Sequence, residues 1–372
     1  MNEVAERLAY RHEVHLFARK AEDLDLSRIH WREMPGIPWP EVADFVTYHY
    51  LADLRIRRRS FDIVHSIGIN AAAANVITIQ NIQPAKRRFL ADWAAAEKVS
   101  FARKVTRQLY LQVTTRVEAK MYRARTSRKP PLFLPVSRGV QRDLLEHYDI
   151  GKAPVRIIPN AADTTRFRPF TLAERKQWRD LNGIPENDIV AVFVGGEWRR
   201  KGLDLAIRAL GRLPQKNVRL VVLGKDAEQA RFEALAQEAG VRGRVEFLGF
   251  RQDVAEAMAA SDLFLFPSWY EAFSLATIEA AACGLPIVAS KINGAEDFVL
   301  PGDTGFFIEH EPEQIAAVLQ PLIEDASARR RMGENARKVV EQRYTWDRVA
   351  RLTEEAYLEY LEGSASRKTN SP

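Results

Sequence analysis

Glu271-Ala-Phe-Ser-Leu-Ala-Thr-Ile-Glu279 is the stretch that decides the fold, because of what flanks it. Residues 261–268 before it form a short apolar run ending in Pro-Ser, which predicts a buried strand. Small residues after it continue to a Gly-Leu-Pro break at 284–286, where a helix should end. Glu271 is therefore expected in a strand-to-helix loop and Glu279 on the helix. In open parallel sheets, such loops bind ligands.

The start of this helix has the chemistry of a phosphate site. Free backbone N–H groups and a partial positive charge at a helix N-terminus suit a diphosphate. Phe273, Ser274 and Leu275 stand where the helix should begin. We therefore expect them to bind a donor that carries such a diphosphate, as a nucleotide sugar does. The carboxylate of Glu279, further along, is placed to accept hydrogen bonds from sugar hydroxyls. The alternative is a solvated helix with two surface glutamates, which the flanking strand and the Gly-Leu-Pro break disfavour.

At these residues the chain resembles the retaining glycosyltransferases of family 4, also called group 1, which have the GT-B fold. The resemblance rests on the two glutamates eight residues apart, on Phe273 and on the Gly-Leu-Pro break. It implies an α/β protein with two Rossmann-like domains whose parallel sheets face each other across a cleft. It also implies that Glu271 contacts the donor sugar and that Glu279 accepts from the ribose hydroxyls.

A second loop, Gly195-Gly-Glu-Trp-Arg-Arg-Lys-Gly202, concentrates positive charge before a predicted helix. Gly195 and Gly196 let the backbone approach a ligand closely. Arg200 and Lys201 would stabilise the charge that builds on a departing diphosphate, and the resemblance gives them, with Glu271, the catalytic roles. The glycine spacing of a dinucleotide fingerprint and the Walker A pattern are absent. A phosphorylase would need a pyridoxal lysine, and none is identified.

The length of 372 residues suggests two domains. We expect an acceptor-side domain at 1–160, a nucleotide-sugar-binding domain at 161–345, a helix at 346–362 that crosses back to the first domain, and a disordered tail at 363–372. The apolar runs predict strands at 12–18, 61–67, 76–80, 132–137, 155–160, 188–195, 218–224, 245–249, 261–268 and 286–290. The helical patterns cover 2–8, 98–125, 137–145, 203–213, 228–239, 254–260, 279–284, 315–342 and 346–361.

The first half departs from the family in two ways. The family usually has a strand and a Gly-Gly loop ahead of the helix at 2–8, so we expect this domain to lack its first strand. Many members carry a histidine where Gln80 and Asn81 stand. These amides can hydrogen-bond a sugar hydroxyl but do not titrate near neutrality, so we expect them to position the sugar.

The net charge of +6 is unevenly distributed. Residues 84–130 hold thirteen Lys or Arg against three Asp or Glu, interleaved with aromatic residues. Such a segment suits an anionic membrane surface, and we expect Lys86, Arg87, Arg88 and Trp93 to face it. A solvated basic face is the alternative. No apolar run is long enough to span a membrane, and the N-terminus does not read as a signal peptide.

The sequence therefore predicts a metal-independent, retaining hexosyltransferase that uses a nucleotide-diphosphate sugar, with UDP- or GDP-sugar expected and no cofactor. The acceptor would be a saccharide or a lipid-linked saccharide of cell-envelope polysaccharide or lipopolysaccharide. We expect a cytoplasmic protein, peripheral at the inner face of the membrane, with its single cysteine, Cys283, in the core. Two alternatives remain: an inactive GT-B remnant that binds membrane or nucleic acid, and a GT-B sugar-nucleotide epimerase. The base, the sugar, the acceptor and the oligomeric state do not follow from the sequence.

Overall fold

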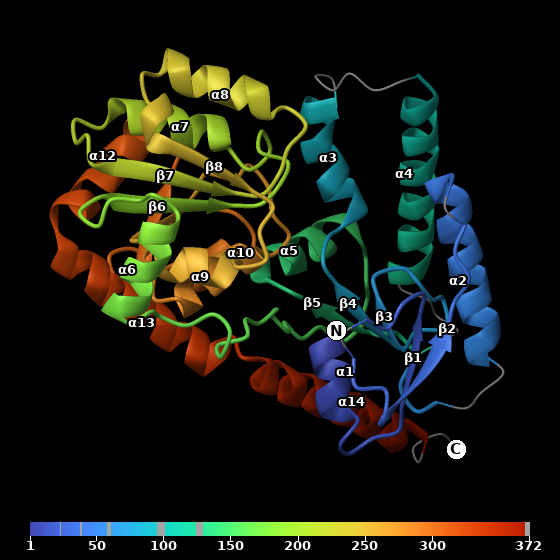
Figure 1. The fold of residues 1–372 in the computed structure, drawn as a ribbon. Coiled ribbons are helices and arrows are strands. Elements are labelled where there is room, and N and C mark those ends of the chain that lie inside the picture. The colour runs from blue at the N-terminus through green and yellow to red at the C-terminus, as the bar shows by residue number, and fades with distance from the viewer. Residues whose placement is uncertain (23, 38, 58–60, 95–100, 124–128, 369–372) are drawn as a thin grey trace. The chain divides into compact units, whose positions relative to one another are not determined.

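The structure is a computed structural model that describes residues 1–22, 24–37, 39–57, 61–94, 101–123 and 129–368. For residues 57, 89–94, 101–104 and 364–368 it describes the backbone alone. The chain divides into two compact units (Figure 1). Unit 1 comprises Met1–Pro159 together with Trp346–Pro372, and unit 2 comprises Asn160–Thr345.

Unit 2 is built on a six-stranded parallel sheet in the order β11-β10-β9-β6-β7-β8. The strands are β6 Ile189–Val194, β7 Val218–Leu223, β8 Val245–Gly249, β9 Leu263–Phe266, β10 Ile287–Ser290 and β11 Gly305–Ile308. All four residues of β9, Leu-Phe-Leu-Phe, are buried, as expected for a parallel strand covered on both faces. The strand order reverses between β6 and β9, so the ligand-binding switch point of such a sheet lies between these two strands.

Helices cover both faces of this sheet, with α7, α8 and α12 on one face and α6, α9 and α10 on the other (Figure 1). Their bounds are α6 Leu172–Leu181, α7 Leu203–Arg212, α8 Gln229–Glu238, α9 Val254–Ala259, α10 Leu275–Ala282, α11 Ala295–Phe298, α12 Pro312–Glu324 and α13 Ala326–Arg343, with a short 3₁₀ turn at Arg242–Arg244. Cys283, at the end of α10, is buried as expected.

Unit 1 contains two smaller parallel sheets. One pairs β1 Val14–Ala18 with β2 Ile29–Glu33, and the other has the order β3-β4-β5, with β3 His65–Ile67, β4 Val76–Ile79 and β5 Leu132–Pro135. The helices are α1 Asn2–Leu8, α2 Glu41–Arg57, α3 Gln83–Ala94, α4 Phe101–Tyr122, α5 Arg138–His147 and α14 Trp346–Lys368. The side chain of Ser137 caps α5 as expected, because it accepts a hydrogen bond from the Val140 N–H at 3.1 Å.

Several expected elements differ in the structure. The strand expected at 155–160 is reduced to one bridge between Phe133 and Val155, because prolines at 154 and 159 remove ladder donors. The helix expected at 315–342 is two helices, since the Asp325 side chain caps the start of α13. Helix α14 runs to Lys368, into the segment expected to be disordered, and residues 369–372 lie outside the described part.

Candidate functional site

The two cations predicted from the sequence meet the first glutamate at the switch point of unit 2. Arg200 and Lys201 lie in the loop between β6 and α7, and Glu271 lies in the loop after β9. Lys201 Nζ is 3.0 Å and Arg200 Nη1 is 3.1 Å from the same oxygen, Glu271 Oε1. All three side chains are largely buried, with 15–17% of each exposed. The fold thus gathers two positive charges and one negative charge where a parallel sheet binds its ligands.

A second carboxylate also holds Arg200. Its Nη2 donates to Glu197 Oε2 at 2.7 Å. Burial alone would lower the pKa of the Arg200 guanidinium, but Glu271 and Glu197 outweigh burial, so the pKa is raised. Arg200 is therefore a fixed positive charge, whose position is set by carboxylates on both sides.

Two glycines shape the loop that carries these cations. Gly195 has φ of +130°, and a Cβ there would lie 2.6 Å from Lys201 Cε. Its missing side chain lets the aliphatic part of Lys201 lie against the backbone. Gly202 has φ of +75°, and a Cβ there would lie 2.1 Å from the carbonyl oxygen of Pro267. Gly202 thus lets the start of α7 contact the chain that leaves β9.

Helix α10 begins four residues after Glu271 in the sequence. Ser274 is its N-cap, with an Oγ that accepts from the Thr277 N–H at 3.3 Å. Phe273 is 8% exposed, and a Cβ on Gly294 would lie 3.0 Å from its ring. Packing of Phe273 thus fixes the turn into α10, and Leu275, the first helical residue, stands at the surface. The predicted strand–loop–helix arrangement is present.

Glu279 lies in the second turn of α10, in a partly buried environment. Burial raises the pKa of this carboxyl, and the charge of Arg166 opposes the rise. Arg166 itself donates from Nη2 to the carbonyl oxygen of Gln252 at 3.3 Å. Sequence reasoning missed Arg166, because nothing in the sequence near residue 166 links it to a glutamate more than one hundred residues later.

An aromatic pair was also missed. The rings of Trp269 and His310 stack with centroids 3.8 Å apart and an interplanar angle of 5°. These residues follow β9 and β11, and His310 Nε2 lies 3.1 Å from both Ser290 Oγ and the Ser268 carbonyl oxygen. The only signal in the sequence is that each aromatic residue closely follows an apolar strand, which does not reveal that the two strand ends approach each other.

The remaining predicted residues lie in unit 1. Gln80 is exposed and Asn81 partly buried, directly after β4. Lys86, Arg87 and Arg88 lie on α3, the first of them partly buried and the other two exposed. The side chain of Trp93 lies outside the described part, as do Lys98, Arg125 and Arg128 entirely.

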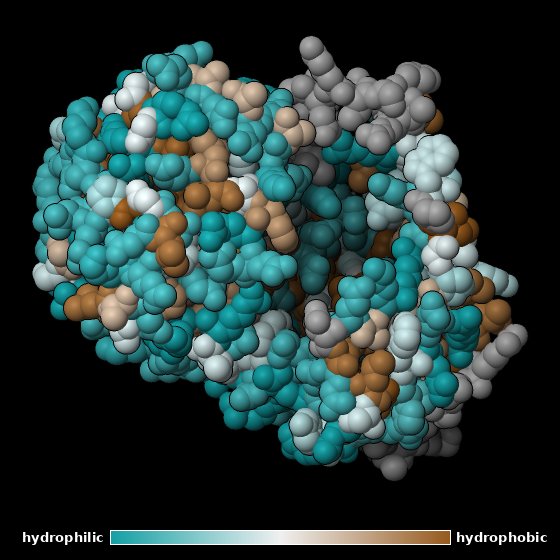
Figure 2. Space-filling view, in the orientation of Figure 1, coloured by the Kyte–Doolittle hydropathy of each residue, from teal (hydrophilic) through white to brown (hydrophobic). Residues whose placement is uncertain are grey.

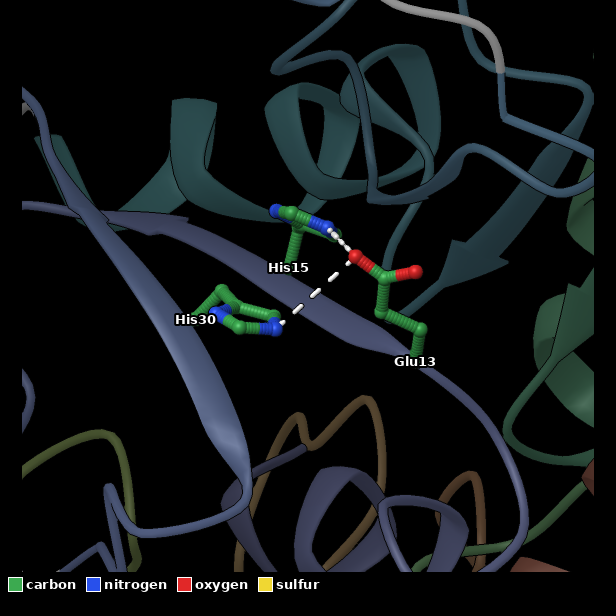
Figure 3. Close-up of side chains that lie close together, drawn as sticks. All are labelled: Glu13, His15 and His30. Atoms are coloured by element: carbon green, nitrogen blue, oxygen red, sulfur yellow. Dashed lines mark hydrogen bonds and ion pairs between the residues drawn. The ribbon is translucent and has the colours of Figure 1, made fainter.

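One group of described residues could hold a metal ion: Glu13, His15 and His30, whose candidate ligand atoms lie within 4.8 Å of one another (Figure 3). His15 and His30 are paired on adjacent strands, and their rings stack 4.7 Å apart. Glu13 Oε1 is 2.8 Å from His15 Nε2 and 3.8 Å from His30 Nε2. However, His15 Nδ1 is buried without a partner, whereas a metal-bound imidazole ordinarily donates its second N–H to an acceptor. Hydrogen bonding and stacking account for this group without a metal.

Two family models together match most of the chain. The model of glycosyltransferase family 4 matches residues 1–166, and that of glycosyl transferases group 1 matches residues 174–339. D-inositol 3-phosphate glycosyltransferase of Corynebacterium aurimucosum is 33% identical over 231 residues, which are 59% of this chain and 55% of that protein. Lipopolysaccharide glucosyltransferase WaaG of Escherichia coli is 35% identical over 202 residues, 52% of this chain and 54% of that protein. The chain thus matches about half the length of these curated relatives.

Solved structures match nearly the whole chain. A crystal structure of WaaG superposes with a TM-score of 0.75 and 24% identity, over 95% of this chain and 93% of that one. Anabaena HepE in complex with UDP and glucose superposes with a TM-score of 0.72 and 21% identity, over 96% and 94%. These likenesses confirm the expected α/β fold of the GT-B class. The two family models, which match successive halves of the chain, show that it belongs to the group 1, family 4 glycosyltransferases.

Proposed function

We propose that this protein transfers a sugar from a nucleotide-diphosphate sugar to a saccharide or lipid-linked acceptor, with retention of the anomeric configuration. The observation that carries the proposal is the convergence of Arg200 and Lys201 on Glu271 Oε1 at the switch point of unit 2. A UDP-sugar is the favoured donor, since the similar Anabaena HepE was crystallised with UDP and glucose. GDP-sugars remain the second candidate.

In the proposed donor site, different groups bind the diphosphate, the ribose and the transferred sugar. Arg200 and Lys201 hold the diphosphate, and the N-terminus of α10 at Ser274 offers backbone N–H groups to it. Glu279 accepts from the ribose hydroxyls. Glu271 contacts the sugar being transferred. The two cations supply the charge that a metal ion would otherwise supply, so no metal is required.

The chemistry then follows from charge. The bond between the anomeric carbon and the phosphate oxygen breaks, and the departing nucleoside diphosphate gains negative charge. Arg200 and Lys201 stabilise this charge more in the transition state than in the ground state. The acceptor hydroxyl oxygen bonds to the anomeric carbon on the face that the diphosphate leaves. Its proton passes to the departing phosphate oxygen, so the protein needs no strong base.

Replacement of the cations tests this proposal. Lys201→Ala and Arg200→Ala should each lower the rate of UDP release from UDP-glucose by about a hundredfold, as expected when a charge that stabilises the transition state is lost. Arg212→Ala is the matched control, because Arg212 lies at the far end of α7 and pairs with Glu313 at the surface. Cation variants that release UDP at the rate of the parent would remove this loop from the reaction.

We further propose that unit 1 binds an anionic membrane surface, which would bring the enzyme to a lipid-linked acceptor at the inner face of the membrane. Exposed apolar side chains accompany the basic residues of α3: Val46, Tyr50 and Leu54 on α2, and Val105 and Leu109 on α4. Figure 2 shows apolar side chains in the region of α2 among hydrophilic ones. Helix α4 contacts both α2 and α3, and a combination of basic and exposed apolar side chains favours binding at the lipid interface. Within the described part of the chain, the helices are too short or too polar to cross a bilayer.

A further inference from the structure

Helix α3 begins without a cap from its own sequence. The residue before it is Ile82, which is fully buried and has no hydrogen-bond acceptor in its side chain. The second helical residue is Pro84, which has no backbone N–H. The N–H of Gln83, at the first position, therefore needs an acceptor from elsewhere, because a buried unpaired N–H is unfavourable.

Glu118, one turn before the end of α4, supplies that acceptor. The Gln83 N–H donates to Glu118 Oε1 at 2.9 Å. The hydroxyl of Tyr148, the residue that follows α5, donates to the same oxygen at 2.8 Å. Helices α3 and α4 lie side by side (Figure 1), and one carboxylate oxygen thus connects α3, α4 and the end of α5.

This contact is shielded from water. Glu118 is only 2% exposed. Tyr122, one turn later on α4, packs edge-on against both Tyr148 and Phe133, with ring centroids 5.6 and 5.2 Å away. A carboxylate in such a place is unfavourable for stability, and an apolar side chain of similar size would be less costly. Core stability therefore does not explain why a carboxylate occupies this position, whereas its hydrogen bond to the start of α3 does.

The Gln83 contact closes one end of a short turn. At the other end, the last residue of β4, Ile79, accepts a hydrogen bond from the Val136 N–H at 3.1 Å. Gln80 and Asn81, the amides proposed to contact the sugar, lie between these two anchors. A turn fixed at both ends holds its side chains at a defined place, and misplacement of such groups by about 1 Å can slow a reaction about a hundredfold.

We propose that Glu118 is a positioning residue for glycosyl transfer, which fixes the turn that carries Gln80 and Asn81 through its hydrogen bond from the Gln83 N–H. This inference rests on the proposed function, because Gln80 and Asn81 can position a transferred sugar only if the protein is a glycosyltransferase. Glu118 itself is buried, so it acts through the backbone of the turn and through Tyr148.

Three variants test this role. Glu118→Leu removes the acceptor and puts an apolar side chain of similar size in its place, so the core should remain packed. Glu118→Gln keeps an oxygen that can accept both hydrogen bonds. Thr114→Ala is the control, because Thr114 is also buried on α4, one turn earlier, and its hydroxyl donates only within its own helix.

Two measurements separate positioning from general stability. In Glu118→Leu, kcat for UDP release from UDP-glucose should fall about tenfold to a hundredfold, while the Kd for UDP, which unit 2 binds, should not change. Glu118→Gln should restore most of kcat, and Thr114→Ala should leave it unchanged. Independently of activity, amide hydrogen exchange at residues 80–88 should accelerate in Glu118→Leu alone.

Three results would overturn the inference: a Leu variant with the kcat of the parent, a fall in kcat matched by equal weakening of UDP binding, or unchanged exchange at residues 80–88. Failure of the proposed function would give a different set of results. In that case the parent would bind neither UDP nor GDP and would release no nucleotide, while the exchange experiment would still report whether Glu118 anchors the turn.

Discussion

The stability of the protein should depend on pH through Glu118, and Glu118→Gln should remove this dependence. Burial raises the pKa of Glu118 from 4.5 to about 7, although the hydrogen bonds from Tyr148 and from the Gln83 N–H both oppose the rise. The folded protein therefore holds a proton on Glu118 up to about pH 7, whereas the unfolded chain releases it above about pH 4.5. Between these values the folded state binds more protons, so its stability falls as the pH rises.

The magnitude follows from the two pKa values. A rise from 4.5 to about 7 corresponds to about 3 kcal/mol in total, at about 1.4 kcal/mol for each pH unit. About 2 kcal/mol of this should be lost between about pH 5.5 and about pH 8. The Gln variant resembles the protonated carboxyl and does not titrate, so relative to the parent it should gain about 2 kcal/mol over the same range.

Urea unfolding of parent and variant at a series of pH values measures this difference directly. All groups that titrate in both proteins cancel in the comparison, and Tyr148→Phe serves as a second reference because it removes one hydrogen bond but keeps the carboxyl. A difference in unfolding free energy between parent and Gln variant that stays constant from about pH 5.5 to about pH 8 would show that Glu118 is ionised in the folded protein throughout, and the reasoning from burial would be wrong.

Three further predictions concern the proposed donor and membrane sites. Glu279→Ala should weaken the binding of UDP-glucose by about 1.5–3 kcal/mol, the usual value of a hydrogen bond to a charged group, and unchanged affinity in calorimetry would remove Glu279 from the ribose site. Chelators should leave transfer intact, because the two cations of the β6–α7 loop neutralise the diphosphate; activity abolished by a chelator and restored by manganese would contradict this. Reversal of Lys86, Arg87 and Arg88 to Glu should strongly lower sedimentation with anionic vesicles, since each basic residue near such a surface contributes about 1 kcal/mol. A parent protein that ignores such vesicles at low salt would defeat the membrane proposal.

Unit 2 was largely predictable from its sequence, because its strands are continuous apolar runs separated by amphipathic or small-residue helices. The places of two candidate site residues in the fold followed from the same pattern. Glu271 was placed in a loop and Glu279 on a helix, and Ser274 caps that helix in the structure. What the pattern did not reveal is that Arg200 and Lys201 share one oxygen of Glu271, because contact between two loops depends on the strand order in space.

Unit 1 was less predictable, for physical reasons that its residues show. Strand β2, Ile29–Glu33, is mostly polar and half-exposed, so it has neither a continuous apolar run nor a clean alternation. Helix α3 has an isoleucine at the capping position and a proline at its second position, so no Ser, Thr, Asp or Asn stands where a cap would mark its start. Its cap comes from Glu118, thirty-five residues further along the chain, and no local pattern can show an acceptor at that distance.

Contacts between residues that lie far apart in the sequence also bear on how the donor site of unit 2 would work. Two cations held close together repel each other, and Glu271 offsets this repulsion by accepting from both. Under the proposed function, a diphosphate that enters the site takes over this role, and Glu271 is then free to turn toward the sugar hydroxyls. The carboxylate would thus keep Arg200 and Lys201 in place before the donor binds, which lowers the reorganisation needed when charge develops on the leaving group. On this reasoning Glu271→Gln should weaken donor binding less than it lowers kcat, because the amide can still contact the sugar but no longer holds the two cations together.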